Sequence, residues 1–303
     1  MLVGGVLKYL VTRFGNRRYA VLLVAAVAAV SLTAAVDPHR SVEPGSTLHQ
    51  QFEATPAAVV SDPVTRPWGS FQDEVDAPDL TGWAIIPEGS DDFLGGALDT
   101  QKWWVYDDGK TAGGKVNASQ LGVGDGLLTI SGQGAGKPGA VSGGLQTAFA
   151  TTYGRWTVRF REDAGAGYGA GVLLWPADEV WPEHGELDIA EIPKGDRQQV
   201  FTAIHYGARN RVVGAAKVKG DFTQFHTFTL EWTEHGIKEW LDGKVILDVK
   251  APKEAIPSWP MRFAMQQDIG TIKCPGGWVQ CANGSTPAVV KMQVDYVHAY
   301  RQG

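Results

Sequence analysis

Residues 186–191 are Glu-Leu-Asp-Ile-Ala-Glu, an apolar and strand-forming stretch that carries three carboxylates. Side chains alternate between the two faces of a strand, so Glu186 and Asp188 share one face while Leu187 and Ile189 share the other. Strict alternation would place Glu191 on the apolar face. One extra residue, a β-bulge, returns Glu191 to the acidic face, and bulges are common beside active sites. We therefore predict a bulged strand with three acids on one face and core residues on the other.

The spacing of the outer two acids suits a known reaction. Four strand steps put the Cα atoms of Glu186 and Glu191 about 13 Å apart. Each side chain reaches roughly 4 Å inward, which leaves the carboxylates near the ~5–5.5 Å separation of retaining glycosidases. Crowded carboxylates also acquire different pKa values, as acid/base catalysis requires. A solvated acidic strand face and a calcium site are the structural alternatives.

The chain from about residue 81 onward has the pattern of many short strands. Apolar and polar residues alternate in three segments, 156–161, 228–232 and 290–296. Asp125-Gly126 and Asp242-Gly243 lie between strand-like runs and predict tight hairpins. This pattern predicts an all-β fold, a two-sheet antiparallel sandwich or jelly roll.

The N-terminal part has the composition of an export segment and a linker. Residues 1–36 hold four basic residues and no acid, and they end in an apolar run at 19–36. We expect a cleaved signal peptide, with an uncleaved signal anchor as the alternative, so the protein is secreted or held at the outer face of the cell membrane. Six prolines in residues 37–80 predict a linker, which leaves one domain at 81–303.

Cys274 and Cys281 are the two cysteines of the chain. Pro and Gly lie between them, and an exported protein meets an oxidising environment, so we expect a small disulfide-closed loop. A metal site is disfavoured because no His is near them in the sequence.

The segment from Val172 to Glu191 resembles the active-site strand of glycoside hydrolase family 16, in its bulged, laminarinase-like branch. Further segments match in the family's order, at 99–103, 153–159, 230–232, 240–243 and 294–297. The resemblance covers about residues 90–301 and implies a concanavalin-like jelly roll with a substrate cleft on its concave face. It also implies a retaining endo-β-glycosidase, in which Glu186 is the nucleophile, Glu191 is the general acid/base and Asp188 hydrogen-bonds the nucleophile.

The resemblance implies several substrate-binding residues. Trp175 and Trp181 border the sugar subsites in similar enzymes, where indole rings stack on pyranose rings, although either ring could instead fill the core. His205 and Tyr206 fall on the next strand, where the family often places a His beside the acids. Gln266 falls where relatives carry an Asn that faces the cleft.

A structural calcium ion is a further implication of the resemblance. Many members bind it through backbone oxygens and an Asp of the last strand, which Asp295 matches here. The chemistry itself needs no cofactor.

Charge narrows the substrate class. The net charge is −6, and without the four basic residues of the leader 23 basic residues face 33 acidic ones. This balance argues against nucleic acid and against sulfated or uronic polymers. We expect a monomer acting on neutral β-1,3-glucan, with mixed-linkage 1,3;1,4-glucan next. A transglycosylase on the same scaffold and a non-catalytic, surface-tethered glycan-binding protein are the alternatives.

Overall fold

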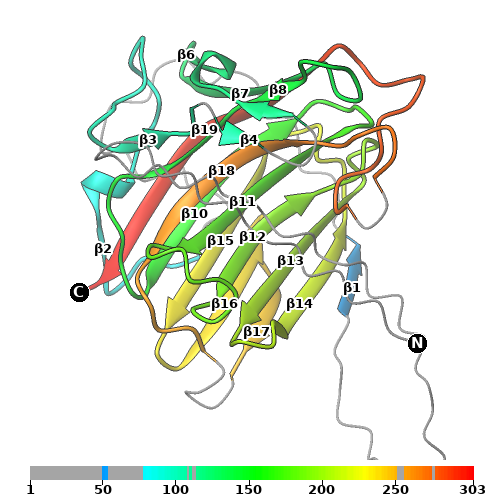
Figure 1. Ribbon diagram of the computed structural model, residues 1–303. Coiled ribbons are helices and arrows are strands. Elements are labelled where there is room, and N and C mark those ends of the chain that lie inside the picture. Colours follow the sequence, from blue (N-terminus) through cyan, green and yellow to red (C-terminus); the bar gives the residue numbers. More distant parts are fainter. Residues whose placement is uncertain (1–49, 54–77, 108, 111–113, 251–255, 275–276) are drawn as a thin grey trace, which may run out of the picture.

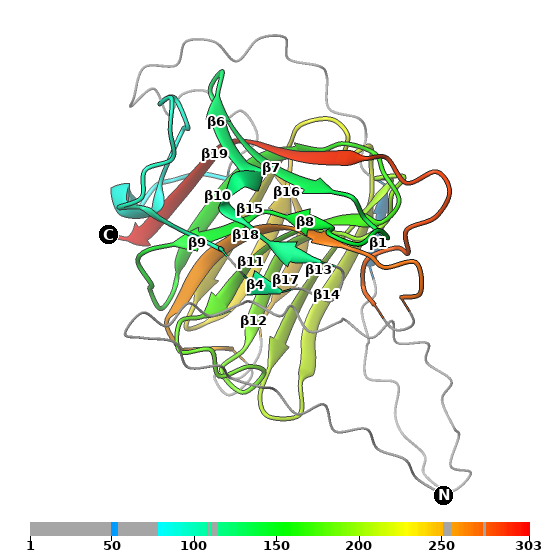
Figure 2. The ribbon, with the colours of Figure 1, turned by 45° about the horizontal axis from the view of Figure 1, so that its top comes forward.

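The computed structural model describes residues 50–53, 78–107, 109–110, 114–250, 256–274 and 277–303. In this part of the chain the regular elements are strands and two short 3-10 helices, η2 (Pro87–Gly89) and η3 (Ala118–Gln120). The strands form two sheets that lie on one another (Figures 1 and 2). The predicted all-β sandwich is confirmed.

The first sheet has eight strands and carries the acidic segment. Its order is β1 (Gln50–Glu53), β14 (Arg211–Lys219), β13 (Gln199–Tyr206), β12 (Glu186–Ile192), β11 (Tyr168–Pro176), β18 (Met261–Ile269), β9 (Gly144–Thr147) and β3 (Trp103–Val105). Neighbours are antiparallel except β1 and β14.

The second sheet has eleven strands. Its main order is β17 (Lys244–Val249), β16 (Gly236–Leu241), β15 (His226–Thr233), β10 (Gly154–Glu162), β19 (Val289–Gln302), β7 (Leu127–Gln133), β8 (Val141–Ser142), β5 (Lys115–Val116) and β4 (Gly109–Lys110). β2 (Trp83–Ile85) adds to β19, and β6 (Leu121–Gly124) adds to β7.

The core lies between the sheets and follows the predicted alternation. Trp156, Val158 and Phe160 of β10 are buried, and they belong to the same apolar cluster as the apolar residues of β12. Aromatic pairs add to this core, since the rings of Phe160 and Phe228 stack with centroids 5.2 Å apart. The acid-bearing strand is therefore fixed on one side by a packed interior.

The two predicted hairpins are confirmed. Asp125-Gly126 joins β6 to β7 and Asp242-Gly243 joins β16 to β17. All four residues have positive φ, between 47° and 72°, as a type I′ turn requires. Asp242 is also tied to β15, because its carboxylate accepts from the backbone N–H of Thr227 at 2.9 Å.

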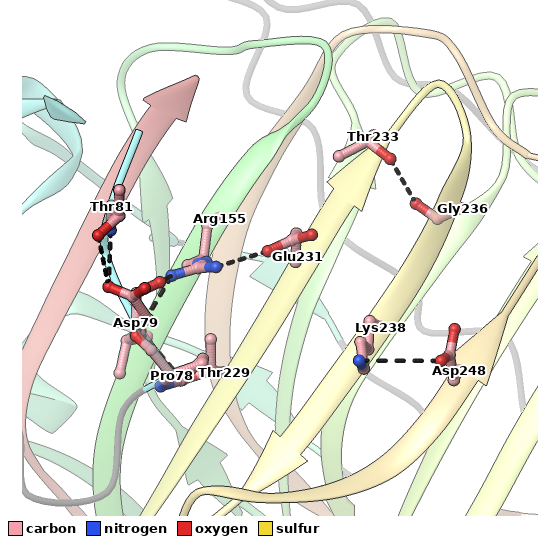
Figure 3. Close-up of polar contacts among 11 residues, drawn as sticks. Pro78, Asp79, Thr81, Arg155, Thr229, Glu231, Thr233, Gly236, Lys238 and Asp248 are labelled. Atoms are coloured by element: carbon pink, nitrogen blue, oxygen red, sulfur yellow. Dashed lines mark hydrogen bonds and ion pairs between the residues drawn. The ribbon is translucent and has the colours of Figure 1, made fainter. Parts of the chain in front are cut away.

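A buried arginine attaches the start of the domain to the eleven-stranded sheet (Figure 3). Arg155 of β10 donates to the carbonyl oxygen of Asp79 at 2.7 Å and pairs with Glu231 at 2.6 Å. Its guanidinium also lies 4.6 Å from the ring centroid of Trp83. These contacts hold Asp79 and Trp83 against the side of the sheet that faces away from the core.

The predictions for the N-terminal part concern residues that are mostly outside the described ones. The leader at 1–36 lies wholly outside, so it stays a prediction. Within the expected linker, Gln50–Glu53 form β1 beside β14, which the linker prediction did not include. None of the helices in the described ranges has the length and apolar character needed to cross a membrane. The predicted Cys274–Cys281 disulfide is present, with a Cα–Cα distance of 5.5 Å.

Candidate active site

A β-bulge in β12 brings the three acids to one face. Asp188 pairs with Leu173 of β11, but Ala190 already pairs with Val172, so Ile189 is the extra residue. The register against β13 shifts at the same place. Ile189 and Ala190 both pack in the core between the sheets. The predicted bulge is confirmed, and it returns Glu191 to the face of Glu186 and Asp188.

Cross-strand pairing identifies the neighbours of the acids on this outer face. Residues directly opposite in an antiparallel pair project to the same side. Glu186 lies opposite His205 of β13. Glu191 lies opposite Gly171, which in turn lies opposite Gln266 of β18. The predicted residues His205 and Gln266 therefore lie on the acid-bearing face.

A hydrogen bond from Trp181 holds Glu186. The indole Nε1 of Trp181 donates to its Oε2 at 2.6 Å, and Asp188 occupies the next position on the same face. Only 3% of Glu186 and 5% of Glu191 is exposed. The bond from Trp181 fixes the carboxylate in one orientation, as a nucleophile requires.

The imidazole of His205, which is neutral, lies beside Asp188. Burial lowers the pKa of His205, and its Nδ1 is 2.8 Å from the oxygen of Asn210, which can only accept. The proton is therefore on Nδ1, and the unprotonated Nε2 lies 3.5 Å from Asp188 Oδ2. Burial raises the pKa of Asp188 well above its usual range, and the neighbouring carboxyl groups of Glu186 and Glu191 add to this effect.

Both outer acids have raised pKa values. Burial raises the pKa of Glu186 to about 7, against the lowering effect of the hydrogen bond from Trp181 and of the neighbouring Asp188. Burial and the charges of Glu186 and Asp268 raise the pKa of Glu191 to about 8. Two neighbouring buried acids with raised pKa values do not both ionise readily near neutral pH, so one of the pair keeps a proton. A carboxylate beside a protonated carboxyl group is the arrangement that a nucleophile and a general acid require.

Trp175 and Trp181 form a stacked pair on the acid-bearing face. Their ring centroids are 6.1 Å apart and their planes differ by 10°. Trp175 packs with Leu173 and Ala264 in a small cluster separate from the main core. Its Nε1 donates to Glu179 at 2.9 Å. The structure thus favours the outer face over the core as the place of both rings.

The other two predicted residues are less closely tied to the acids. Tyr206, the last residue of β13, comes one step after His205, and alternation directs it to the opposite face. Asp295 of β19 has a cation beside it, because Arg159 Nη1 lies 2.5 Å from its Oδ2. This ion pair already neutralises the carboxylate that calcium would use, and calcium binding stays a prediction. Among the described residues, the cluster with metal-ligand spacing is Glu186, Asp188 and His205.

Two residues on the acid-bearing face have no counterpart in the sequence predictions. Asp268 of β18 accepts from Gln266 at 2.7 Å, and burial raises its pKa to about 6. Trp104 of β3 is 46% exposed, and the guanidinium of Arg262 lies 4.2 Å from its ring centroid. Alternation contains a signal for both, since Asp268 follows Gln266 by two positions and Trp104 follows the buried Trp103 by one.

One rung of the sheet connects Trp104 to the acids. Asp188 pairs with Leu173, Leu173 with Ala264, Ala264 with Gln146, and Gln146 with Trp104. The aromatic ring is therefore four strand spacings from Asp188, roughly 19 Å. This face offers a long row of side chains rather than a compact site for one small molecule.

Comparison with known proteins agrees with the geometry. The chain is 28% identical over 236 residues to Endo-1,3-1,4-beta-glycanase EglC of Rhizobium meliloti, which covers 69% of this chain and 48% of that protein. It is 27% identical over 250 residues to a Beta-glucanase of Rhodothermus marinus, covering 72% of this chain and 85% of the other. The chain thus spans about half the length of the Rhizobium protein.

Solved structures share the fold. The laminarinase catalytic domain from Thermotoga maritima superimposes with a TM-score of 0.63 at 20% identity, covering 73% of this chain and 99% of that domain. The family model for glycosyl hydrolases family 16 matches residues 106–297, which include all three acids. On the strength of this match over more than half of its length, the chain belongs to glycosyl hydrolases family 16.

Proposed function

We propose that this chain is a retaining endo-β-glycosidase that hydrolyses β-1,3-glucan or mixed 1,3;1,4-glucan. The observation that carries the proposal is the bulged strand, on which Glu186 and Glu191 share one face, and burial raises the pKa of both acids. The named activities of the Rhizobium and Rhodothermus relatives support the choice of a β-glucan.

The first step forms a covalent intermediate. The Glu186 carboxylate, held at Oε2 by Trp181, attacks the anomeric carbon as the bond to the leaving oxygen breaks. Glu191 gives its proton to that oxygen, so the departing chain leaves as a neutral alcohol. Glu186 is then an ester and Glu191 a carboxylate.

The second step reverses these roles. Glu191 takes a proton from water, and the resulting hydroxide attacks the anomeric carbon and releases Glu186 as a carboxylate. Two displacements on one carbon leave the product with the β-configuration of the substrate. Asp188, kept neutral by burial, donates to Glu186 without placing a second negative charge beside it.

The acid-bearing face supports a polymeric substrate. Trp181 and Trp175 lie beside the nucleophile, and the ring of Trp104 lies roughly 19 Å from Asp188 along one rung. Pyranose rings present apolar faces that stack on indole rings. A glucan lying across the strands would contact both groups of rings at once, which favours action within a chain.

We further propose that the domain functions outside the cytoplasm. The Cys274–Cys281 disulfide supports this location, because such bonds persist in oxidising compartments. The leader-like composition of residues 1–36 is consistent with export.

The full chain and its Glu186→Ala variant should be incubated with laminarin, lichenan, agarose and xyloglucan, with products resolved by mass. Oligosaccharides from one of the two β-1,3-containing glucans, absent with the variant, would support the proposal. Products longer than the starting chains would instead indicate transglycosylation. Binding without any cleavage would favour a glycan-binding protein.

A further inference from the structure

A carboxyl group from the opposite sheet reaches toward the catalytic strand. Glu239 of β16 lies opposite Leu230, and its neighbours on the same face, Ile237 and Leu241, belong to the main core. Glu239 is 1% exposed. Among the ion pairs of the described residues, none includes Glu239. An acid in such a place must be neutral or well hydrogen-bonded to persist.

Its partner is the hydroxyl of Thr202 on β13. Thr202 Oγ1 makes a short hydrogen bond with Glu239 Oε2, and it lies 2.5 Å from the backbone carbonyl oxygen of Asp188. A hydroxyl has one hydrogen, and a carbonyl can only accept. The Thr202 hydrogen therefore goes to Asp188, and Glu239 supplies the hydrogen of the other bond. The burial that raises the pKa of Glu239 well above its usual range agrees with a neutral acid.

The carbonyl that receives this bond is at the bulge. Asp188 pairs with Ala203 and Glu191 pairs with Phe201, so Thr202 lies opposite the two bulge residues. A bulge interrupts the ladder of backbone hydrogen bonds, and a buried carbonyl still needs a donor. The Thr202 hydroxyl provides one from the side, with Glu239 behind it.

We propose that Glu239 and Thr202 are positioning residues that hold the bulge of β12 in its active shape. Glu186 and Asp188 precede the bulge and Glu191 follows it, so its conformation sets how the nucleophile and the acid face each other. The inference rests on the proposed function for its effect on catalysis. A misplacement of about 1 Å can lower a rate by roughly 10²-fold.

Matched substitutions separate a hydrogen-bonding role from packing. Thr202→Val and Glu239→Leu remove the hydroxyl and the acid while keeping a similar volume, and each should lower kcat on the order of 10²-fold with little change in KM. Thr202→Ser and Glu239→Gln retain a donor and should keep near wild-type kcat. The control is Thr229→Val, since Thr229 is equally buried and bonded to Thr157 in the other sheet, away from the acids.

Several outcomes would overturn the inference. The first is that Thr202→Val and Glu239→Leu both fold and keep wild-type kcat. The second is that these two variants lose no more kcat than Thr229→Val does. The third is that Glu239→Gln is as impaired as Glu239→Leu. KM reports substrate binding separately, so a change confined to KM would also contradict a positioning role.

A second measurement does not depend on activity. Amide hydrogen exchange followed by mass spectrometry should be faster over 186–192 and 199–206 in Glu239→Leu and Thr202→Val than in wild type, and unchanged there in Thr229→Val. If the wild-type chain cleaved no glucan, the proposed function would fail. The exchange measurement would still show whether Glu239 and Thr202 hold the bulge of β12. Unchanged exchange in both Glu239→Leu and Thr202→Val would overturn the inference that these residues hold the bulge.

Discussion

Replacing Glu191 with Gln should reduce the loss of stability that the protein undergoes as the pH rises from about 5 to about 8. The pKa of Glu191 is raised from 4.5 to about 8 in the folded protein, chiefly by burial. Between these values the folded protein keeps a proton that the unfolded chain releases. Stability therefore falls as pH rises through this window and levels off above pH about 8. Gln cannot ionise, so the Glu191→Gln variant does not show this fall in stability with rising pH.

The expected size follows from the same pKa. One pKa unit corresponds to about 1.36 kcal/mol, so the full difference is worth roughly 5 kcal/mol. At pH 8 the chain would have lost roughly 4 kcal/mol of this, and at pH 5 less than about 1 kcal/mol. The buried amide of Gln adds a cost that is independent of pH. The gap between variant and wild type should thus change by roughly 3 kcal/mol from pH 5 to pH 8.

Urea unfolding of the oxidised full chain at several pH values between about 5 and 8 measures this gap. Glu183→Gln is the matched control, because Glu183 is exposed and lies close in sequence to the acids. Its gap to wild type should be constant across the range. If the Glu191→Gln gap were equally constant, the raised pKa of Glu191 and the account of its proton would be refuted.

Four further outcomes are expected. The profile of kcat/KM against pH should be bell-shaped, rising as Glu186 ionises near pH 7 and falling as Glu191 loses its proton near pH 8; a flat profile would contradict the assignment. Glu191→Ala should still cleave activated aryl glycosides, whose leaving groups need little protonation, and equal loss on natural glucan and aryl glycosides would count against its role as acid. Trp104→Ala should lower kcat/KM roughly tenfold or less on long glucans but not on short oligosaccharides, measured as a chain-length series; an equal loss on both would exclude a remote sugar contact. Arg197→Met should lower the free energy of unfolding by about 3–5 kcal/mol, because it leaves the fully buried Glu162 without the partner that lies 2.7 Å away; a change below about 1 kcal/mol in urea unfolding would contradict this.

The sequence contains enough to predict the central strand. The alternation of Glu186, Leu187 and Asp188 already assigns faces, and the two residues before Glu191 require a bulge if all acids are to share one face. The two Asp-Gly pairs predict hairpins, since both residues tolerate the positive φ of a type I′ turn. These features depend on neighbouring residues only, so local rules are sufficient.

Other parts of the site depend on contacts between distant segments. Nothing around Glu239 in the sequence indicates that it meets Thr202, because the two come from different sheets. The charge of Asp268 raises the pKa of Glu191 although the two residues are two strands apart in the sheet. The exposure of Trp104 depends on the place of β3 at the sheet edge. Such relations follow from strand order, which alternation does not determine.

The anomeric configuration of the first product tests the central claim most directly. Wild-type chain and Glu186→Ala should be mixed with laminarin, and the new reducing ends followed by proton NMR before mutarotation. A double displacement at Glu186 predicts that the β-anomer appears first and that the variant yields no product. The α-anomer appearing first, or cleavage that persists in the variant, would contradict Glu186 as the nucleophile of a retaining enzyme.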